Sequence, residues 1–333
     1  MKEGDIGPLS PRREFLKRGL QAAAALAATG GMGAWLWNRH PPGDLSTEKA
    51  FDPRKDFAMG IEGPRMSIAA GQDRAVMLRT ALKALGGIER FIKRGDRVLI
   101  KVNAAFATPA ALAATSHPAL VAEIVRLCRT AGASSVVVTD NPINDPASCF
   151  ELTGIGQAVR QSGGDLFLPY AGAFRKGSLP GAKLIRNWPV MQEPFKGVTK
   201  LIGVAPVKNH QRAGASMTLK NWYGLLGGRR NQFHQDIDGI ITELAALVRP
   251  TFVILDGTQS MMTNGPTGGS LADLKDTHAL VVSTDPVAAD AFGCTLLGKT
   301  VHDLPYLIRA GELGLGAVDY ESLRPIRVEA RAS

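Results

Sequence analysis

A chain of 333 residues with 45% hydrophobic and 21% charged residues can bury a large core, which excludes an intrinsically disordered protein. The formal net charge is +9, but residues 1–41 hold six Lys or Arg and three acids, which leaves +6 on the remainder. No basic run is interleaved with aromatic residues, and only 6% of residues are aromatic, so we expect no nucleic-acid partner.

The first forty residues predict an export signal. Arg12 and Arg13 are followed, after one further residue, by Phe15 and Leu16, which is the twin-arginine pattern, and the uncharged stretch 19–37 comes next. This stretch is only weakly hydrophobic, which favours a transient signal over a permanent anchor. We therefore expect the Tat translocase as a partner and a periplasmic or other extracytoplasmic location. No clean Ala-x-Ala site ends the stretch, so cleavage and an uncleaved membrane anchor are both compatible with the sequence.

Three parts are expected along the chain. Residues 1–40 form the twin-arginine signal, and residues 41–64, rich in Pro, Gly and charge, form a linker. Residues 65–330 alternate helix and strand patterns and are expected to form a single α/β domain.

The periodicity of apolar residues predicts the elements of this domain in chain order. Helices are expected over 73–91, from an N-cap at Ser116 to residue 131, and over 150–162, 238–248 and 286–297. Buried strands are expected over 97–102, 135–139, 200–207, 252–255 and 279–283. A strand, a helix and a strand within about forty residues predict a parallel crossover unit. The fold class is therefore α/β, a mostly parallel sheet covered by helices on both faces.

The cysteine pattern excludes some cofactors. Cys128, Cys149 and Cys294 include no C-x-x-C pair, so neither a disulfide framework nor a cysteine-held metal cluster is available. We expect no iron–sulfur cluster in this chain.

Polar side chains follow the predicted strands at the points where they end. They are Lys101 and Asn103, Asp140 and Asn141, Lys208 with Asn209 and His210, Asp256, and Asp285. In open parallel sheets, ligands bind beyond the carboxyl ends of the strands, so these residues predict one shared cleft. Each aspartate alone is equally well explained as the cap of the turn or helix that follows.

The stretch 207–234 is the densest in polar groups. Its basic residues are punctuated by glycines, which suits an anion such as a phosphate or a carboxylate, and a solvated basic face is the alternative. A glycine-rich loop at 264–269 could bring backbone N–H groups to the same ligand, although it lacks the ending of a Walker loop.

The order of several motifs resembles a known family. They are the strand 97–103, the segment Pro206 to His210, the segment Thr218 to Gly224 (TLKNWYG), His234, Asp256-Gly257, Gly265-Pro266 and the segment Ser283 to Asp290 (STDPVAAD). Together they look like the domain of unknown function 362 family over about residues 65–300. The resemblance implies an organisation and candidate positions but no established reaction. Many members also carry a ferredoxin-type cysteine module, which this chain lacks.

Two functional classes follow, and we favour the first, an exported enzyme that acts on an anionic small molecule. The candidate catalytic residues are His210, His234, Lys220 and Asp256, and the candidate substrate-binding residues are Lys101, Asn103, Lys208, Asn221, Gly265, Asp285 and Asp290. The second class is a redox-accessory protein, in which the two histidines and one of three aspartates (256, 285 or 290) hold a metal or an acidic cofactor. The sequence leaves the identity of any metal or cofactor unknown.

A hairpin is expected to bring the two histidines together. The flanks of His210 and His234 are glycine-rich or turn-like, so the segment between them can fold back as a loop, a helix and a loop. Both imidazoles would then lie on one side of the sheet, within roughly 10 Å of Lys220 and Asp256, the span of a small ligand pocket.

Overall fold

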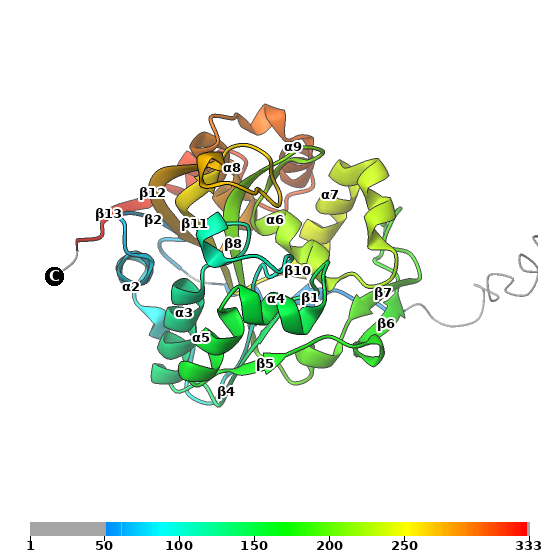
Figure 1. Ribbon diagram of the computed structural model, residues 1–333, viewed down its shortest axis with the longest axis horizontal. Helices are drawn as coiled ribbons and strands as arrows, with labels where there is room; N and C mark the ends of the chain where they lie inside the picture. The colour runs from blue at the N-terminus through cyan, green and yellow to red at the C-terminus, as the bar shows by residue number, and fades with distance from the viewer. Residues whose placement is uncertain (1–50, 61, 332–333) are drawn as a thin grey trace, which may run out of the picture. The chain divides into compact units, whose positions relative to one another are not determined.

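The computed structural model describes residues 51–60 and 62–331. A nine-stranded sheet runs through this body in the order β13-β2-β12-β11-β8-β3-β4-β5, and β9 pairs with β8 (Figure 1). Its strands are β2 (Met66–Ala70), β3 (Arg97–Lys101), β4 (Ser135–Thr139), β5 (Asp165–Phe167), β8 (Lys200–His210), β9 (Gly214–Ser216), β11 (Phe252–Met261), β12 (Leu274–Ser283) and β13 (Ile326–Glu329). Two smaller pairs join β1 (Lys55–Asp56) to β10 (Val248–Arg249) and β6 (Phe174–Gly177) to β7 (Trp188–Met191).

Most neighbouring strands of the large sheet are parallel. Strands β11, β8, β3, β4 and β5 run parallel to one another, and β13 runs parallel to β2. Strand β12 is antiparallel to both β11 and β2, and β9 is antiparallel to β8. The expected crossover from β3 to β4 is present as a parallel pair that starts at Arg97 and Ser135.

Helices cover both faces of the sheet, which confirms the predicted fold class (Figure 1). On one face lie α2 (Arg74–Ala84), α3 (Pro118–Thr130), α4 (Pro146–Leu152) and α5 (Ile155–Gln161), and on the other lie α6 (Thr218–Asn221), α7 (Ile237–Leu247), α8 (Pro286–Leu296) and α9 (Pro305–Glu312). Alternate residues of each strand feed the two resulting cores. In β11, for example, Ile254 packs with α2 and α3, whereas Val253 and Leu255 pack with α6 to α8.

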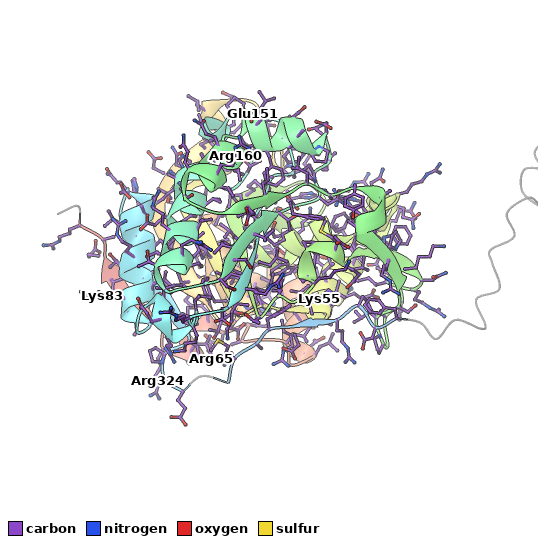
Figure 2. The ribbon with its side chains drawn as sticks, turned by 90° about the horizontal axis from the view of Figure 1, so that it is seen from below. Lys55, Arg65, Lys83, Glu151, Arg160 and Arg324 are labelled. Carbon is purple, nitrogen blue, oxygen red and sulfur yellow. The ribbon has the colours of Figure 1, made fainter. Side chains whose placement is uncertain are left out.

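Charged side chains lie on the surface of the body, as Figure 2 shows for Lys83, Glu151, Arg160 and Arg324. Arg160 and Glu151 form an ion pair of 3.6 Å with both side chains largely exposed. Such exposed pairs stabilise a fold by at most about 1 kcal/mol. Among the described helices, none is long and apolar enough to cross a membrane. The expected signal at residues 1–40 and residues 41–50 and 61 of the expected linker lie outside the described residues, and the described part of the linker includes β1.

Two helix predictions need correction. The expected helix 73–91 ends at Ala84, because Gly86 and Gly87 adopt positive φ angles and a short 3-10 turn, Ile88–Arg90, follows. The expected helix 150–162 is two helices, α4 and α5, separated at Gly154 with φ 75°. A left-handed glycine of this kind ends a helix because its backbone leaves the α-helical region.

Finer boundaries also differ from the prediction, since β8 extends to His210 instead of residue 207 and β12 begins at Leu274 instead of residue 279. His117, not Ser116, caps α3, because its side chain accepts a hydrogen bond from the Ala119 N–H. Ser116 instead joins neighbouring strands, since its hydroxyl accepts from Asn103 N–H and donates to the Val204 carbonyl. Strand β11 does not end at residue 255 but continues to Met261, with a shift of register past residue 257.

Candidate functional site

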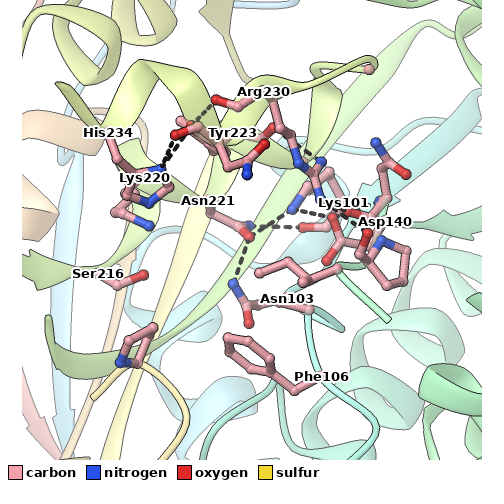
Figure 3. Close-up of a pocket in the computed structure, with 18 of the residues that line it drawn as sticks. Lys101, Asn103, Phe106, Asp140, Ser216, Lys220, Asn221, Tyr223, Arg230 and His234 are labelled. Carbon is pink, nitrogen blue, oxygen red and sulfur yellow. Dashed lines mark hydrogen bonds and ion pairs between the residues drawn. The ribbon is translucent and has the colours of Figure 1, made fainter. Parts of the chain in front are cut away.

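A pocket of about 700 Å³ opens beyond the carboxyl ends of β3, β4 and β8 (Figure 3). Strand β3 and the turn after it supply Lys101 and Asn103, the turn after β4 supplies Asp140, and the segment from β8 onward supplies the rest of the polar wall. The three strands are parallel neighbours, so their ends meet at one edge of the sheet.

The structure brings most of the sequence-predicted residues to this pocket. Lining it are Lys101, Asn103, Lys208, His210, Lys220, Asn221 and His234. Asp256, Gly265, Asp285 and Asp290 do not line it, although Pro266, next to Gly265, does.

The floor of the pocket is a buried ion pair. Lys101 Nζ lies 2.6 Å from Asp140 Oδ1 and also donates to the Val102 carbonyl and to Asn221 Oδ1, each at 2.8 Å. Asp140 in turn accepts from the Ala104 and Asn141 N–H groups. Burial lowers the pKa of Lys101, and Asp140 opposes that shift by favouring the charged ammonium. Because all three ammonium protons have partners, Lys101 builds the site and has none left for a ligand.

Asn221 holds the floor to the sheet. Its Oδ1 accepts from Lys101 and from Asn103 Nδ2, and its Nδ2 donates to the carbonyls of Lys101 and Val204 at 3.3 and 3.2 Å. These four bonds use the full capacity of a side-chain amide. Asn221 is therefore an organising residue, and its helix α6 is fixed over the ends of β3 and β8.

Gly224 lies against the same ion pair. A Cβ at this position would lie 2.1 Å from Asp140 Oδ1 and 2.7 Å from Lys101 Nζ, closer than any real contact. The TLKNWYG segment is thus explained in part: Asn221 organises the floor, and Gly224 leaves room for it.

Lys208 forms a second, less saturated cationic group. Its Nζ donates to the Ala114 carbonyl, with Asn103 Oδ1 at 3.4 Å, and lies 5.4 Å from the centre of the Phe106 ring. The side chain is only 1% exposed and has no carboxylate within ion-pair distance among the described residues. Burial, and then the charge of Lys220, lower the pKa of Lys208 to about 7.

Lys220 and Arg230 line the opposite wall around Tyr223 (Figure 3). The Arg230 guanidinium donates to four backbone carbonyls, those of residues 141, 142, 223 and 226. Lys220 Nζ lies 5.4 Å from the centre of the Tyr223 ring and, within residues 51–60 and 62–331, has no hydrogen-bond or ion-pair partner. Burial, followed by the charges of Arg230 and Lys101, lowers the pKa of Lys220 to about 8.

The hydrogen bonds of His210 fix it as a neutral ring, and its single N–H is on the nitrogen that makes no backbone contact. Its Nδ1 accepts from the N–H groups of Arg212 and Ala213 at 3.2 and 3.1 Å. Nδ1 therefore carries the lone pair, and the hydrogen-bond pattern assigns the proton to Nε2. Burial, then the charge of Lys220, lower the pKa of His210 to about 3, so the ring is neutral near pH 7.

His234 is held in the opposite tautomer. Its Nδ1 lies 3.1 Å from the Asn231 carbonyl, which can only accept, and 3.2 Å from the Tyr223 hydroxyl. That hydroxyl donates its own proton to the Arg230 carbonyl, so it accepts from His234. Nδ1 therefore carries the proton and Nε2 the lone pair. Burial and the charge of Lys220 lower the pKa of His234 as well.

The two histidines lie side by side, with ring centres 6.0 Å apart and planes 20° apart. His210 thus presents an N–H donor, and His234 presents a lone pair. Such a pair can offer a proton to one atom of a ligand while accepting a proton from another. The expected fold-back of the segment 207–234 places them together through β9, α6 and the two 3-10 turns Trp222–Leu225 and Arg230–Asp236.

Asp256 lies on the other face of the sheet. Because β11 continues past residue 255, Asp256 alternates with Leu255 and shares the face of Ile254, toward α2. There its Oδ2 pairs with Arg74 at 2.8 Å, and its Oδ1 accepts from the N–H and hydroxyl of Thr258. The expected proximity of Asp256 to the histidines rested on a strand end that the structure does not have.

The remaining predicted residues make local contacts outside the pocket. Asp285 caps α8 by accepting from Ala288 N–H and also lies 3.5 Å from Arg65. Asp290 accepts from the Thr218 and Leu219 N–H groups and so fixes the start of α6. Gly265 packs so closely on β8 that a Cβ would lie 1.9 Å from the carbonyl oxygen of residue 209.

The aspartates therefore do not join the histidines as metal ligands. In the described part of the chain, no three His, Cys, Asp or Glu side chains are grouped so that they could hold a metal ion. The structure therefore does not bring the two histidines together with any of the three aspartates that the sequence suggested as a further metal ligand.

Sequence reasoning placed Asp140 among the strand-end residues of the shared cleft but not among the candidate site residues, and it did not single out Tyr223 or Arg230 as parts of the pocket. Asp140 was visible at a strand end but was equally well explained as a cap. Arg230 stands in the basic stretch 207–234, and Tyr223 stands within the TLKNWYG motif, but nothing in the sequence indicates that one hydroxyl would link Arg230 to His234.

Comparison with family models confirms the resemblance to the domain of unknown function 362 family. Residues 98–295, more than half of the chain, match the model of the domain of unknown function DUF362. The thylakoid-associated protein sll1697 of Synechocystis sp. is 25% identical over 264 residues, which cover 75% of this chain and 78% of that protein. The structure of the lactate racemase apoprotein from Thermoanaerobacterium thermosaccharolyticum is similar with a TM-score of 0.38 and 13% identity, covering 71% of this chain and 57% of that one.

Proposed function

The chain belongs to the DUF362 family, whose description names no reaction, and from its pocket we propose that the protein is an enzyme that acts on an anionic organic molecule. The observation that carries this proposal is the imbalance of charge in the pocket. Four cations line it, Lys101, Lys208, Lys220 and Arg230, and Asp140 is the one acid among the described lining residues.

Lys101 forms an ion pair with that single acid, so the other three cations have no acidic partner among the described residues that line the pocket. Burying an ammonium without a charged partner costs several kcal/mol unless a ligand or a shift of pKa compensates. Both effects are consistent with the site: burial lowers the pKa values of Lys208 and Lys220, and a bound anion would favour their charged forms. A carboxylate or phosphate is the ligand chemistry that such a site favours.

The neighbouring histidines support a catalytic role rather than mere binding of an anion. His210 offers a proton donor and His234 a proton acceptor, in a pocket large enough for an organic molecule. The alternative, a protein that holds an acidic organic cofactor, uses the same cations. Mass spectrometry of the denatured, purified protein would favour this alternative if it recovered a stoichiometric organic anion.

A thermal-shift panel tests the proposal. At a concentration about 100-fold above Kd, a bound anion stabilises the folded state by about 2.7 kcal/mol, which corresponds to a rise in Tm of roughly 5–10 °C. We expect such a rise with phosphate, sulfate or dicarboxylates, and a much smaller rise in Lys208→Met and Lys220→Met. Lys83→Met, on the exposed surface, is the matched control and should respond like the wild type. No shift with any anion at millimolar levels would contradict anion binding.

We also propose export by the twin-arginine route, on the pattern around Arg12 and Arg13. Replacing both arginines by lysine keeps the charge and removes the pattern. The double variant should accumulate as folded protein in the cytoplasm, and cell fractionation would measure this. Undiminished export of the variant would refute the route.

A further inference from the structure

Lys220 differs from the other cations of the pocket in having no assigned partner. Lys101 uses all its protons, Lys208 donates to the Ala114 carbonyl, and Arg230 is fixed by backbone carbonyls. Lys220 Nζ faces the Tyr223 ring at 5.4 Å and, within the described ranges, contacts no acceptor.

The surroundings of Lys220 favour the neutral amine. Burial disfavours its charge, and Arg230 and then Lys101 repel it, so the pKa falls to about 8. At pH 7 roughly a tenth of the side chain is then an unprotonated amine, which is the nucleophilic form. Among residues 51–60 and 62–331, no carboxylate lies within ion-pair distance to hold the proton on Lys220, as Asp140 does for Lys101.

The two histidines supply the proton handling that an amine nucleophile requires. His234 Nε2 carries a lone pair, because Nδ1–H is directed at the Asn231 carbonyl. His210 presents Nε2–H, because its Nδ1 accepts from the backbone. The charge of Lys220 contributes to the pKa shifts of both rings, which places the three groups within electrostatic range of one another.

We propose that Lys220 Nζ is a nucleophile that forms an imine with the carbonyl carbon of an oxo acid, so that the substrate class is an anion bearing an aldehyde or ketone. This inference rests on the proposed function, because Lys208 and Arg230 supply the field that holds the carboxylate. The volume of about 700 Å³ accommodates such a molecule.

The reaction balances without a further reactant. The neutral amine of Lys220 adds to the carbonyl carbon, while His210 Nε2–H donates a hydrogen bond to the carbonyl oxygen. His234 Nε2 then carries both amine protons, one after the other, to that oxygen. The first transfer gives a carbinolamine, and the second accompanies loss of the oxygen as water and formation of the C=N bond. Nothing is oxidised or reduced.

Reductive trapping tests this step. The purified protein is incubated with glyoxylate, pyruvate or 2-oxoglutarate and with cyanoborohydride, which converts an imine to a stable secondary amine. For at least one acid we expect one adduct per chain, heavier than the protein by the mass of the free acid less one oxygen atom, and peptide mapping should assign it to Lys220. Lys220→Met should lose this adduct, whereas Lys83→Met should retain it.

Further variants separate the imine from mere anion binding. His234→Gln should slow adduct formation by at least about a hundredfold, the lower end of what general acid–base catalysis contributes, while its thermal shift with the same acid persists. Thermal stabilisation by the acids without any adduct at Lys220 would overturn the imine and leave the anion site standing. The absence of both would overturn both proposals. Adducts scattered over surface lysines, and unchanged in Lys220→Met, would also overturn the imine.

Discussion

Gly224→Ala probes the floor of the pocket without removing a charged group. The added Cβ would lie 2.1 Å from Asp140 Oδ1 and 2.7 Å from Lys101 Nζ, so both side chains would have to move apart by about 1 Å or more. Replacing glycine by alanine at a compatible site stabilises a protein by about 0.4–1 kcal/mol, whereas breaking a buried ion pair costs about 3–5 kcal/mol. The clash should therefore dominate, with a net loss of about 3 kcal/mol and a fall in Tm on the order of 10 °C.

The assay is chemical and thermal denaturation of Gly224→Ala beside Gly269→Ala. Gly269 is exposed, has no heavy atom within 4 Å of its added Cβ and lacks a positive φ angle, so its variant should match the wild type within about 1 kcal/mol. A Gly224→Ala protein as stable as the Gly269→Ala control would refute the packed floor.

A double variant checks that the ion pair is the cause. Lys101→Met leaves Asp140 buried without its partner and should cost about 3–5 kcal/mol by itself. If Gly224→Ala acts by breaking the same pair, the combined variant should lose clearly less than the sum of the two single losses. Strict additivity would mean that the two positions act separately.

Three further outcomes are expected from buried titratable groups. Burial raises the pKa of Asp290 to about 7. The stability that Asp290 contributes is therefore fully present below its pKa in the unfolded chain and is lost as pH rises through about 7. In Asp290→Asn, the difference in urea midpoint between about pH 4 and about pH 8 should shrink. Burial lowers the pKa of His210 to about 3, so stability that is present above its pKa in the unfolded chain is lost as pH falls from about 6.5 towards 3. The stability of His210→Gln should therefore be less sensitive to acid than that of the wild type. An equal acid sensitivity would contradict the buried neutral ring. Asp256→Asn should lower the unfolding midpoint, because it weakens the contact with Arg74. The anion-induced thermal shift should remain, because Asp256 lies on the face of the sheet opposite the pocket. Loss of that shift at unchanged stability would contradict this placement.

The main lines of the fold could be predicted from local pattern. Strand β4 matches the expected residues 135–139, and β3 and α8 differ from the expected bounds by one residue, because continuous apolar runs and proline at a helix start are strong local signals. The length of β11 was not predictable in the same way. Its outer half has a glycine and three successive polar residues after Asp256 (GTQSM), and only pairing with β12 shows that these residues are still strand.

The pocket was predicted as a set of strand ends, and Lys208 and His210 line it although β8 continues past its expected end at residue 207 to His210. Lys101 and Lys208 converge because β3 and β8 are parallel neighbours. The argument fails for Asp256, because the strand continues and alternation turns its side chain away. Sequence also cannot distinguish a saturated lysine from a free one. Only their three-dimensional contacts place Lys101 in the floor of the pocket, paired with Asp140, and Lys220 in its wall, beside the Tyr223 ring.

The central claim is that an anion binds at the cations that lack an acidic partner. Crystals soaked in selenate, with the ion located by its anomalous scattering, test this most directly, because selenate carries the charge and the oxygens of sulfate. The account predicts selenate in the pocket, with an oxygen within hydrogen-bond distance of Lys220 Nζ and another near Lys208 or Arg230, and its loss from the Lys220→Met protein. A pocket that stays free of selenate while the ion occupies surface sites in the same crystal would contradict the account.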